Sequence, residues 1–81
     1  MNTNDVGRFI SELRKEKGFT QKELAEKLSI TDKAVSKWET GRSAPDISLL
    51  SHLSEILGVS VIEILNGERI EKESQRYWQG F

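Results

Sequence analysis

The chain has 81 residues, which allows one compact domain and at most a short tail. It contains no cysteine and a single histidine, which excludes disulfide scaffolds, thiolate zinc sites and cysteine nucleophiles. Lysine and arginine number 12, and aspartate and glutamate number 13. The resulting net charge of −1 argues against nucleic acid, because proteins that neutralise phosphates usually carry a basic excess.

The start of the chain predicts a first helix, because its apolar residues recur at the spacing of one helix face. We expect Asn4 or Asp5 to cap this helix at its N-terminus. Gly18 is its expected end, since a residue in the left-handed conformation commonly follows a helix. The apolar positions are Val6, Phe9, Ile10 and Leu13.

A second helix is predicted over about residues 20–28. Thr20 and Glu23 have the T-x-x-E spacing of a capping box, in which each side chain accepts a hydrogen bond from the other residue's backbone N–H. The helix must end near Ser29, because another capping residue, Thr31, follows almost at once.

A third helix is predicted over about residues 31–40, with Val35 and Trp38 facing inward and Gly41 closing it. Its link to the second helix is only about three residues long. So short a link forces the two helices to cross at a large angle rather than to lie antiparallel. The small side chain of Ala25 lets them approach closely.

Two more helices complete the predicted bundle. The fourth begins at residues 45–46 and ends at Gly58, and a short fifth is capped by Ser60 and ends at residues 66–67. Because no run alternates as a strand would, the sequence predicts an all-α fold, a compact five-helix bundle. The positions expected to face the core are Ile47, Leu50, Leu53 and Leu57 in the fourth helix, and Val61, Ile64 and Leu65 in the fifth.

Residues 68–81 are mostly polar, but four apolar or aromatic side chains among them have spacings compatible with one helix face. The segment is therefore either a tail or linker, or a sixth helix whose aromatic side chains pack on the bundle or serve dimerisation with a partner subunit. These side chains are Ile70, Tyr77, Trp78 and Phe81.

Specific motifs span the second to fifth predicted helices. The sequence reads F-T-Q-K-E-L-A-E-K-L from Phe19, V-S-K-W-E-T-G-R from Val35 and L-G-V-S from Leu57, with Pro45 between the last two. Over about residues 6–66, this pattern resembles the Cro and phage-repressor (XRE-type) family of helix-turn-helix regulators. The resemblance implies the lambda-repressor-like DNA-binding fold.

By this resemblance, residues 5–67 form the helix-turn-helix DNA-binding domain and residues 68–81 the tail. The sequence departs from the family at Ser29, which stands where the family usually has glycine in the turn. If this residue has positive φ, serine costs on the order of 1 kcal/mol relative to glycine.

The resemblance implies that the third helix lies in the major groove with its N-terminal half against base edges. Lys33 and Lys37 lie one turn apart on one face, and either could donate to guanine O6 and N7. Ser36 can donate or accept, and Asp32 either accepts from a cytosine amino group or favours the helix N-terminus electrostatically. The alternative is that all four are solvated residues of a helix face.

Contacts to the DNA backbone are expected from four other residues. The resemblance places Gln21, which begins the second helix, as a phosphate clamp, because free N–H groups and the positive helix end lie there. Lys22 could join from the same edge. Arg42 and Ser43 follow the third helix and should reach the flanking phosphates.

The resemblance also pairs Arg14 with Glu39 in a buried ion pair that joins the first helix to the end of the third; the alternative is two exposed charges. Removing one partner of a real buried pair would cost roughly 3–5 kcal/mol. His52 has no nucleophile or carboxylate dyad beside it, so we expect it to be solvated. We therefore expect no enzyme, no metal and no cofactor.

Charge is segregated along the chain. Residues 8–43 carry nine basic and six acidic side chains, which is +3, whereas residues 44–81 carry three and six, which is −3, and Asp5 adds −1. A +3 segment predicts few phosphate contacts per subunit. We therefore expect a homodimer on a pseudo-palindromic operator, with half-sites about 34 Å apart. The expected dimer surface comprises Val59, Val61, Ile62 and the aromatic tail.

Two functions remain open at this point. The first is a sequence-specific, double-stranded DNA-binding transcriptional regulator, most simply a repressor. The chain has no room for a sensor domain beyond the tail, so we expect no small-molecule effector, and the chain is either a stand-alone regulator or the N-terminal part of a longer one. The alternative is a protein-interaction module such as an antitoxin or coactivator built on the same bundle. No targeting or membrane-spanning signal is visible, so we expect a cytoplasmic protein without a membrane partner.

Overall fold

The computed structural model describes residues 2–70, and this part of the chain contains five helices and no strand. The prediction of an all-α bundle is therefore confirmed, while the possible sixth helix lies almost entirely outside the described residues. No helix of the described part is long and apolar enough to cross a membrane. The helices are α1 (Thr3–Glu16), α2 (Gln21–Leu28), α3 (Asp32–Glu39), α4 (Ile47–Leu57) and α5 (Val61–Asn66).

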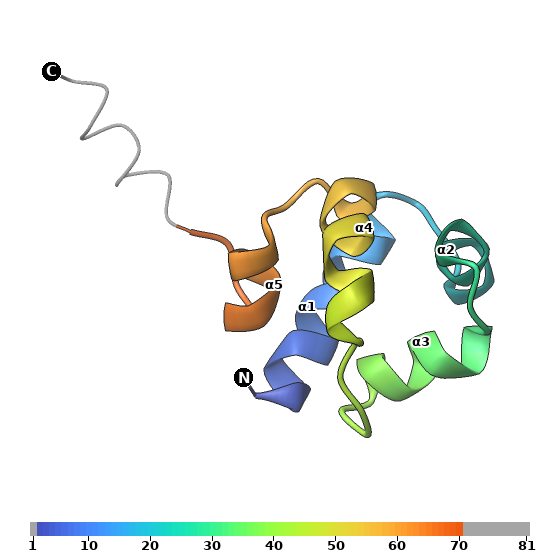
Figure 1. Cartoon of the computed structure of the whole chain (residues 1–81), viewed down its shortest axis with the longest axis horizontal. Helices are drawn as coiled ribbons and strands as arrows, with labels where there is room; N and C mark the ends of the chain where they lie inside the picture. Colours follow the sequence, from blue (N-terminus) through green and yellow to red (C-terminus); the bar gives the residue numbers. More distant parts are fainter. Residues whose placement is uncertain (1, 71–81) are drawn as a thin grey trace, which may run out of the picture.

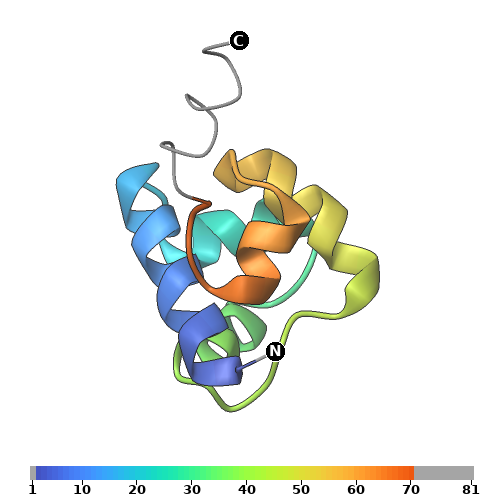
Figure 2. The same cartoon turned by 90° about the vertical axis from the view of Figure 1, so that its left-hand side faces the viewer.

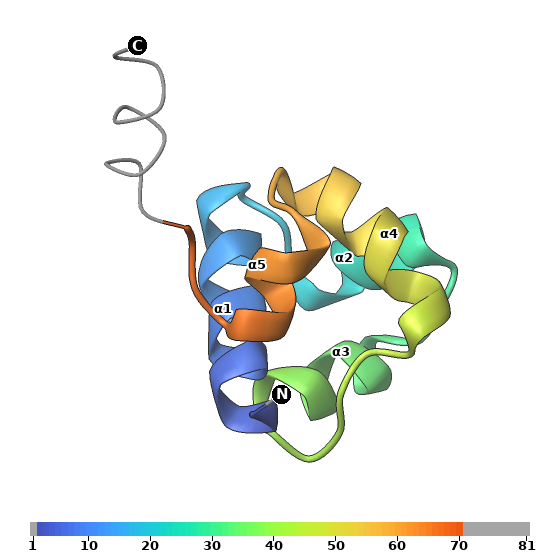
Figure 3. The same cartoon turned by 60° about the vertical axis from the view of Figure 1, so that its left-hand side comes forward.

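The long helix α1 is the element around which the others are arranged. It contacts α3, α5 and α4, and α2 packs on α3 and α4. Figure 1 shows α2 and α3 together at one end of the molecule, with α1 and α4 in the middle and α5 at the other end. In Figure 2, α1 and α5 lie side by side. In the turned view of Figure 3, α3 lies beside the N-terminal end of α1 and below α4.

Local capping chemistry determines most helix ends. Both directions of the Thr20–Glu23 capping box are present, at 3.0 and 2.8 Å. Thr31 caps α3, as predicted, by accepting from the backbone N–H of Ala34. The prediction for α1 was wrong, because Asn2 is its cap and accepts from two backbone N–H groups at 2.9 and 3.2 Å. The amide of Asn2 satisfies these donors, so the helix begins before Asn4 and Asp5.

Thirteen side chains form a single core to which all five helices contribute. The predicted inward positions of α1 are all buried, as are Leu50, Leu53 and Leu57 of α4. The prediction that Ile47 faces the core was wrong, because this side chain is 84% exposed. Ile47 is the first residue of α4, three residues before Leu50, which is the first buried residue of that helix. Helical spacing identified the stripe but could not identify where along α4 the neighbours end.

Helices α1 and α3 cross in close contact at Gly7. A Cβ atom built on Gly7 would lie 1.9 Å from the backbone carbonyl oxygen of Trp38. No side chain larger than hydrogen fits at this crossing, so the absence of a Cβ atom lets α3 lie directly against α1. The role of Gly7 was not predictable from the sequence, because an isolated glycine within a helical pattern carries no sign of what lies against it.

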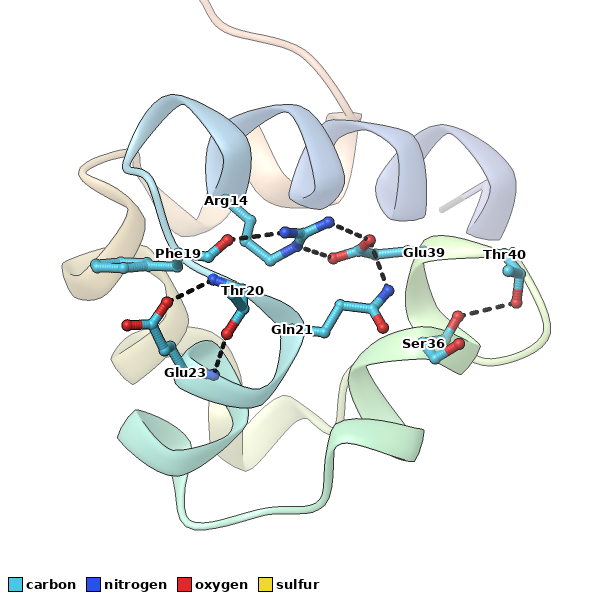
Figure 4. Close-up of polar contacts among 8 residues, drawn as sticks. All are labelled: Arg14, Phe19, Thr20, Gln21, Glu23, Ser36, Glu39 and Thr40. Carbon is cyan, nitrogen blue, oxygen red and sulfur yellow. Dashed lines mark hydrogen bonds and ion pairs between the residues drawn. The ribbon is translucent and has the colours of Figure 1, made fainter.

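A polar network joins the first three helices (Figure 4). Arg14 of α1 forms two hydrogen bonds with Glu39, the last residue of α3, at 2.6 Å from Nε and 3.0 Å from Nη2. Its Nη1 donates to the backbone carbonyl of Phe19 at 2.8 Å, just before α2. The side chains of Arg14 and Glu39 are only 12% and 7% exposed. Such a bidentate, enclosed arrangement fixes the relative positions of the elements that it joins.

This network also sets the protonation state of Glu39. Burial alone raises the pKa of the Glu39 carboxyl, but hydrogen bonds and the positive charge of Arg14 outweigh this effect and lower the pKa below its ordinary value. Hydrogen bonds from Gln21 and Ser11 act in the same direction as those from Arg14. The same pair raises the pKa of Arg14. Both side chains are therefore charged over the whole neutral range.

The last described residues are attached to α1 and α5. Arg69 Nη2 donates to Glu16 of α1 at 2.6 Å, and both side chains are about half exposed. The backbone N–H of Ile70 donates to Glu63 of α5 at 2.8 Å. These contacts fix the point at which the chain leaves the bundle, at the end of the molecule away from α2 and α3 (Figure 1).

We predict that Gly7→Ala destabilises the protein by about 3 kcal/mol, although alanine is the better helix former, because the added methyl group forces α1 and α3 apart. Urea unfolding measures this. Gly18→Ala is the matched control: Gly18 has φ +76° but nothing within 4 Å of its Cβ position, so only about 1 kcal/mol of backbone strain is expected. Equal stability of Gly7→Ala and the parent would contradict the steric argument.

We predict that Glu39→Gln lowers stability at pH 7 by about 2 kcal/mol, because the amide can replace only part of the carboxylate's bonding to Arg14. A carboxyl whose pKa is lowered by folding contributes stability above its unfolded pKa, and this contribution is lost as pH falls through the folded value. The parent and variant stabilities should therefore converge as pH falls below about 4.5. Urea unfolding from pH 7 to pH 3 tests this, with the exposed Glu55→Gln as control.

Candidate nucleic-acid interface

The link between α2 and α3 comprises three residues, Ser29, Ile30 and Thr31. Ser29 has φ 58° and ψ 41°, which is the left-handed conformation. Its N–H donates back to the carbonyl of Glu26, and the next N–H donates to that of Ala25. The tight turn is therefore complete with serine in place of glycine, at a cost on the order of 1 kcal/mol.

The orientation of α3 divides its residues into two sets. Val35 and Trp38 are 0% and 4% exposed and belong to the core. Of the residues predicted to contact bases, Asp32, Lys33 and Lys37 are exposed and Ser36 is half-buried. Within residues 2–70, neither Lys33 nor Lys37 forms an ion pair. Helix α3 thus presents two uncompensated ammonium groups one turn apart.

The loop that follows α3 is held by backbone hydrogen bonds. The N–H groups of Arg42 and Ser43 both donate to the carbonyl of Lys37, at 2.9 and 3.4 Å. The Arg42 side chain is exposed and outside any ion pair of the described residues, while Ser43 is half-buried. The loop therefore presents the guanidinium of Arg42 close to the C-terminal end of α3.

Gln21 has a contact that sequence reasoning missed. It is the first residue of α2, as predicted, but its Nε2 donates to Oε1 of Glu39 at 3.0 Å (Figure 4). Thr40 was also missed: its hydroxyl donates to the carbonyls of Ser36 and Lys37, at 2.9 and 3.3 Å, and closes the last turn of α3. Thr40 is the last residue of the predicted helix, and this position was a usable signal, whereas nothing local to Gln21 indicates a partner 18 residues away.

Lys22 and Asp32 both line one hollow between α2 and α3. The hollow has a volume of about 330 Å³ and is otherwise lined by Ala25, Glu26, Ile30 and Thr31. The charge of the Lys22 ammonium is offset by the carboxylates of Glu26 and Asp32, which line the same hollow. The positive character of this surface therefore comes mainly from Lys33, Lys37 and Arg42 rather than from Lys22.

Two observations on the described part of the chain concern acid–base and metal chemistry. His52 is exposed on α4, as expected. No group of three or more histidine, aspartate or glutamate residues that could hold a metal ion is present within residues 2–70. The features that combine geometry with chemistry are thus the exposed face of α3 and the two segments beside it.

Several known proteins that are named as helix-turn-helix regulators are similar in sequence to this chain. The HTH-type transcriptional activator BcrR of Enterococcus faecalis is 38% identical over 61 residues, which are 75% of this chain and 30% of that protein. The uncharacterized HTH-type transcriptional regulator YqaE of Bacillus subtilis is 41% identical over 66 residues, 82% and 57% of the two chains. Multiprotein-bridging factor 1 of Candida albicans is 41% identical over 56 residues, 69% and 37% of the two chains. The chain thus spans between 30% and 57% of the length of these relatives.

The fold is also similar to solved structures. The clp gene regulator ClgR from Corynebacterium glutamicum superposes with a TM-score of 0.73 at 30% identity, over 83% of this chain and 71% of that chain. A family model described as helix-turn-helix matches residues 10–64. These residues include all of α2, α3 and α4 and the turn between α2 and α3. Because the match extends over well over half of the chain, the protein belongs to the XRE-type helix-turn-helix family.

Proposed function

We propose that this protein is a transcriptional regulator that binds double-stranded DNA sequence-specifically, with α3 in the major groove. The observation that carries this proposal is the exposed pair Lys33 and Lys37, which form no ion pair with any described residue and lie on a helix whose opposite side is buried in the core. Lysine donors held rigidly on one helix face suit guanine O6 and N7. Ser36 and Asp32 lie on the same helix and supply the remaining polar groups for base edges.

Phosphate contacts come from both flanks of α3. Gln21 and Lys22 lie at the start of α2, and Arg42 and Ser43 lie in the loop after α3. Such contacts fix the register of the recognition helix on the duplex without reading sequence. With so few cations available, we propose a homodimer on a pseudo-palindromic operator, so that two weak half-site contacts combine. The exposed Ile62 of α5, at 61%, lies within the proposed dimer surface with Val59 and Val61.

The proposed direction of regulation is repression in the cytoplasm, by occupying DNA that a polymerase needs. A small bundle can block access without contacting any other protein. The relative BcrR is named an activator, so a promoter fusion that carries the selected operator is the direct test of direction. Loss of reporter expression on adding this protein supports repression, and a gain overturns that part of the proposal.

The second candidate is a protein-interaction module. The similarity to multiprotein-bridging factor 1, whose name describes bridging between proteins, favours it. Selection of binding sites from random DNA separates the two functions. Enrichment of one sequence supports the regulator. If the bound DNA stays random in sequence, even at low salt, the result favours the interaction module.

We predict that Lys37→Ala weakens binding to the selected operator by about 1–3 kcal/mol and relaxes the preference at one base pair, because a base contact is lost. Arg42→Ala should instead weaken all sequences alike and reduce the salt slope by about one unit, because a phosphate contact is lost. Fluorescence anisotropy on operator and scrambled duplexes over a salt series measures both. If both variants bind like the parent, the proposed docking of α3 is wrong.

A further inference from the structure

The side chain of Gln21 belongs both to the proposed DNA surface and to the internal polar network. It is half-buried at the first position of α2, where the proposed function places a phosphate. Its Nε2 donates to Oε1 of Glu39, 3.0 Å away at the last position of α3 (Figure 4). The amide therefore spans from the start of one helix to the end of the proposed recognition helix.

Glu39 determines which way round this amide lies. An ionised carboxylate can only accept hydrogen bonds, whereas a glutamine amide has a donor end and an acceptor end. The reversed amide would place the Gln21 carbonyl oxygen against two carboxylate oxygens, and these acceptors repel one another. With Nε2 turned toward Glu39, one Nε2 hydrogen and the carbonyl oxygen of Gln21 are left for other partners.

Glu39 is itself held in place by Arg14. The guanidinium binds both carboxylate oxygens, at 2.6 and 3.0 Å, and also the carbonyl of Phe19, at 2.8 Å. Phe19 is only two residues before Gln21, so the same guanidinium fixes the backbone that leads into α2. The position of the Gln21 amide is thus constrained from its own backbone and from Glu39 before any ligand binds.

We propose that Glu39, supported by Arg14, is a positioning residue for DNA binding, because it holds Gln21 with its second Nε2 hydrogen free for a phosphate oxygen. This inference rests on the proposed function. A donor that is already oriented loses less conformational freedom on binding, so the contact is stronger than one from a freely rotating glutamine. The pair of charges inside the bundle thereby contributes to affinity without touching DNA.

A double-mutant cycle on the selected operator tests this proposal. Gln21→Ala should weaken binding about tenfold, which is the usual value of one hydrogen bond to a charged group. Glu39→Gln should weaken binding by between about twofold, the value for an amide that is correctly oriented half of the time, and the factor for Gln21→Ala, because the amide of Gln21 is then free to reverse or to turn away. The double variant should bind no more weakly than Gln21→Ala alone, since Glu39 acts only through Gln21. If the two effects multiply instead, Glu39 does not act through Gln21 and the proposal is wrong.

Lys22→Ala is the matched control for the double-mutant cycle. Lys22 neighbours Gln21 but has no bond to the network, so the effects of Lys22→Ala and Glu39→Gln should multiply. Circular dichroism at the assay temperature establishes that each variant is folded. If the parent itself enriches no sequence, the proposed function fails as a whole. If the parent binds its operator but the effects of Gln21→Ala and Glu39→Gln multiply, only the positioning role fails.

A measurement on the parent protein covers the possibility that Glu39→Gln does not fold. The two Nε2 hydrogens of Gln21 give separate resonances in a ¹⁵N-edited NMR spectrum. One should exchange slowly with water in the free protein, because it is bonded to Glu39, and the other should become protected only when the operator is added. Equal exchange of both hydrogens in the free protein would overturn the proposal.

Discussion

The arrangement of the first three helices depends on the guanidinium of Arg14. It is almost enclosed, and it binds the last residue of α3 and the carbonyl that precedes α2 from a position on α1. A buried charge without a partner is strongly unfavourable, so neither α3 nor the entry to α2 can move away without stranding it. The geometry of the turn between α2 and α3 is therefore coupled to α1, which makes no direct contribution to the proposed DNA surface.

The second constraint is the direct contact between backbones at Gly7. The Arg14 network acts near the C-terminal end of α1, whereas Gly7 lets α3 lie against its N-terminal half. Both attachments meet α3 at its last two residues, Trp38 and Glu39, so the C-terminal end of α3 is held to α1 at two separate points along α1. Rigid support of this kind is what a recognition helix needs, because the bases that it reads are fixed in a stiff duplex.

Local chemistry made much of this structure predictable from the sequence. The capping box at Thr20 and Glu23, the cap at Thr31 and the turn at Ser29 each depend on residues within one turn of one another, so their patterns are visible in the sequence. The periodicity of α4 predicted its stripe but not the exposure of Ile47, because exposure depends on where neighbouring helices end. Gly7 and Gln21 have roles defined by partners far along the chain, and no local pattern marks such partners.

The point at which the chain leaves the bundle has a consequence for how the domain can be combined with others. Arg69 and Ile70 are attached to α1 and α5 at the end of the molecule opposite α2 and α3. A fluorescent protein or sensor domain fused after residue 70 would begin its path on the side away from the proposed groove-facing helix. The bundle is thus suited to serve as an interchangeable module, in which an appended domain need not compete for space with the bound duplex.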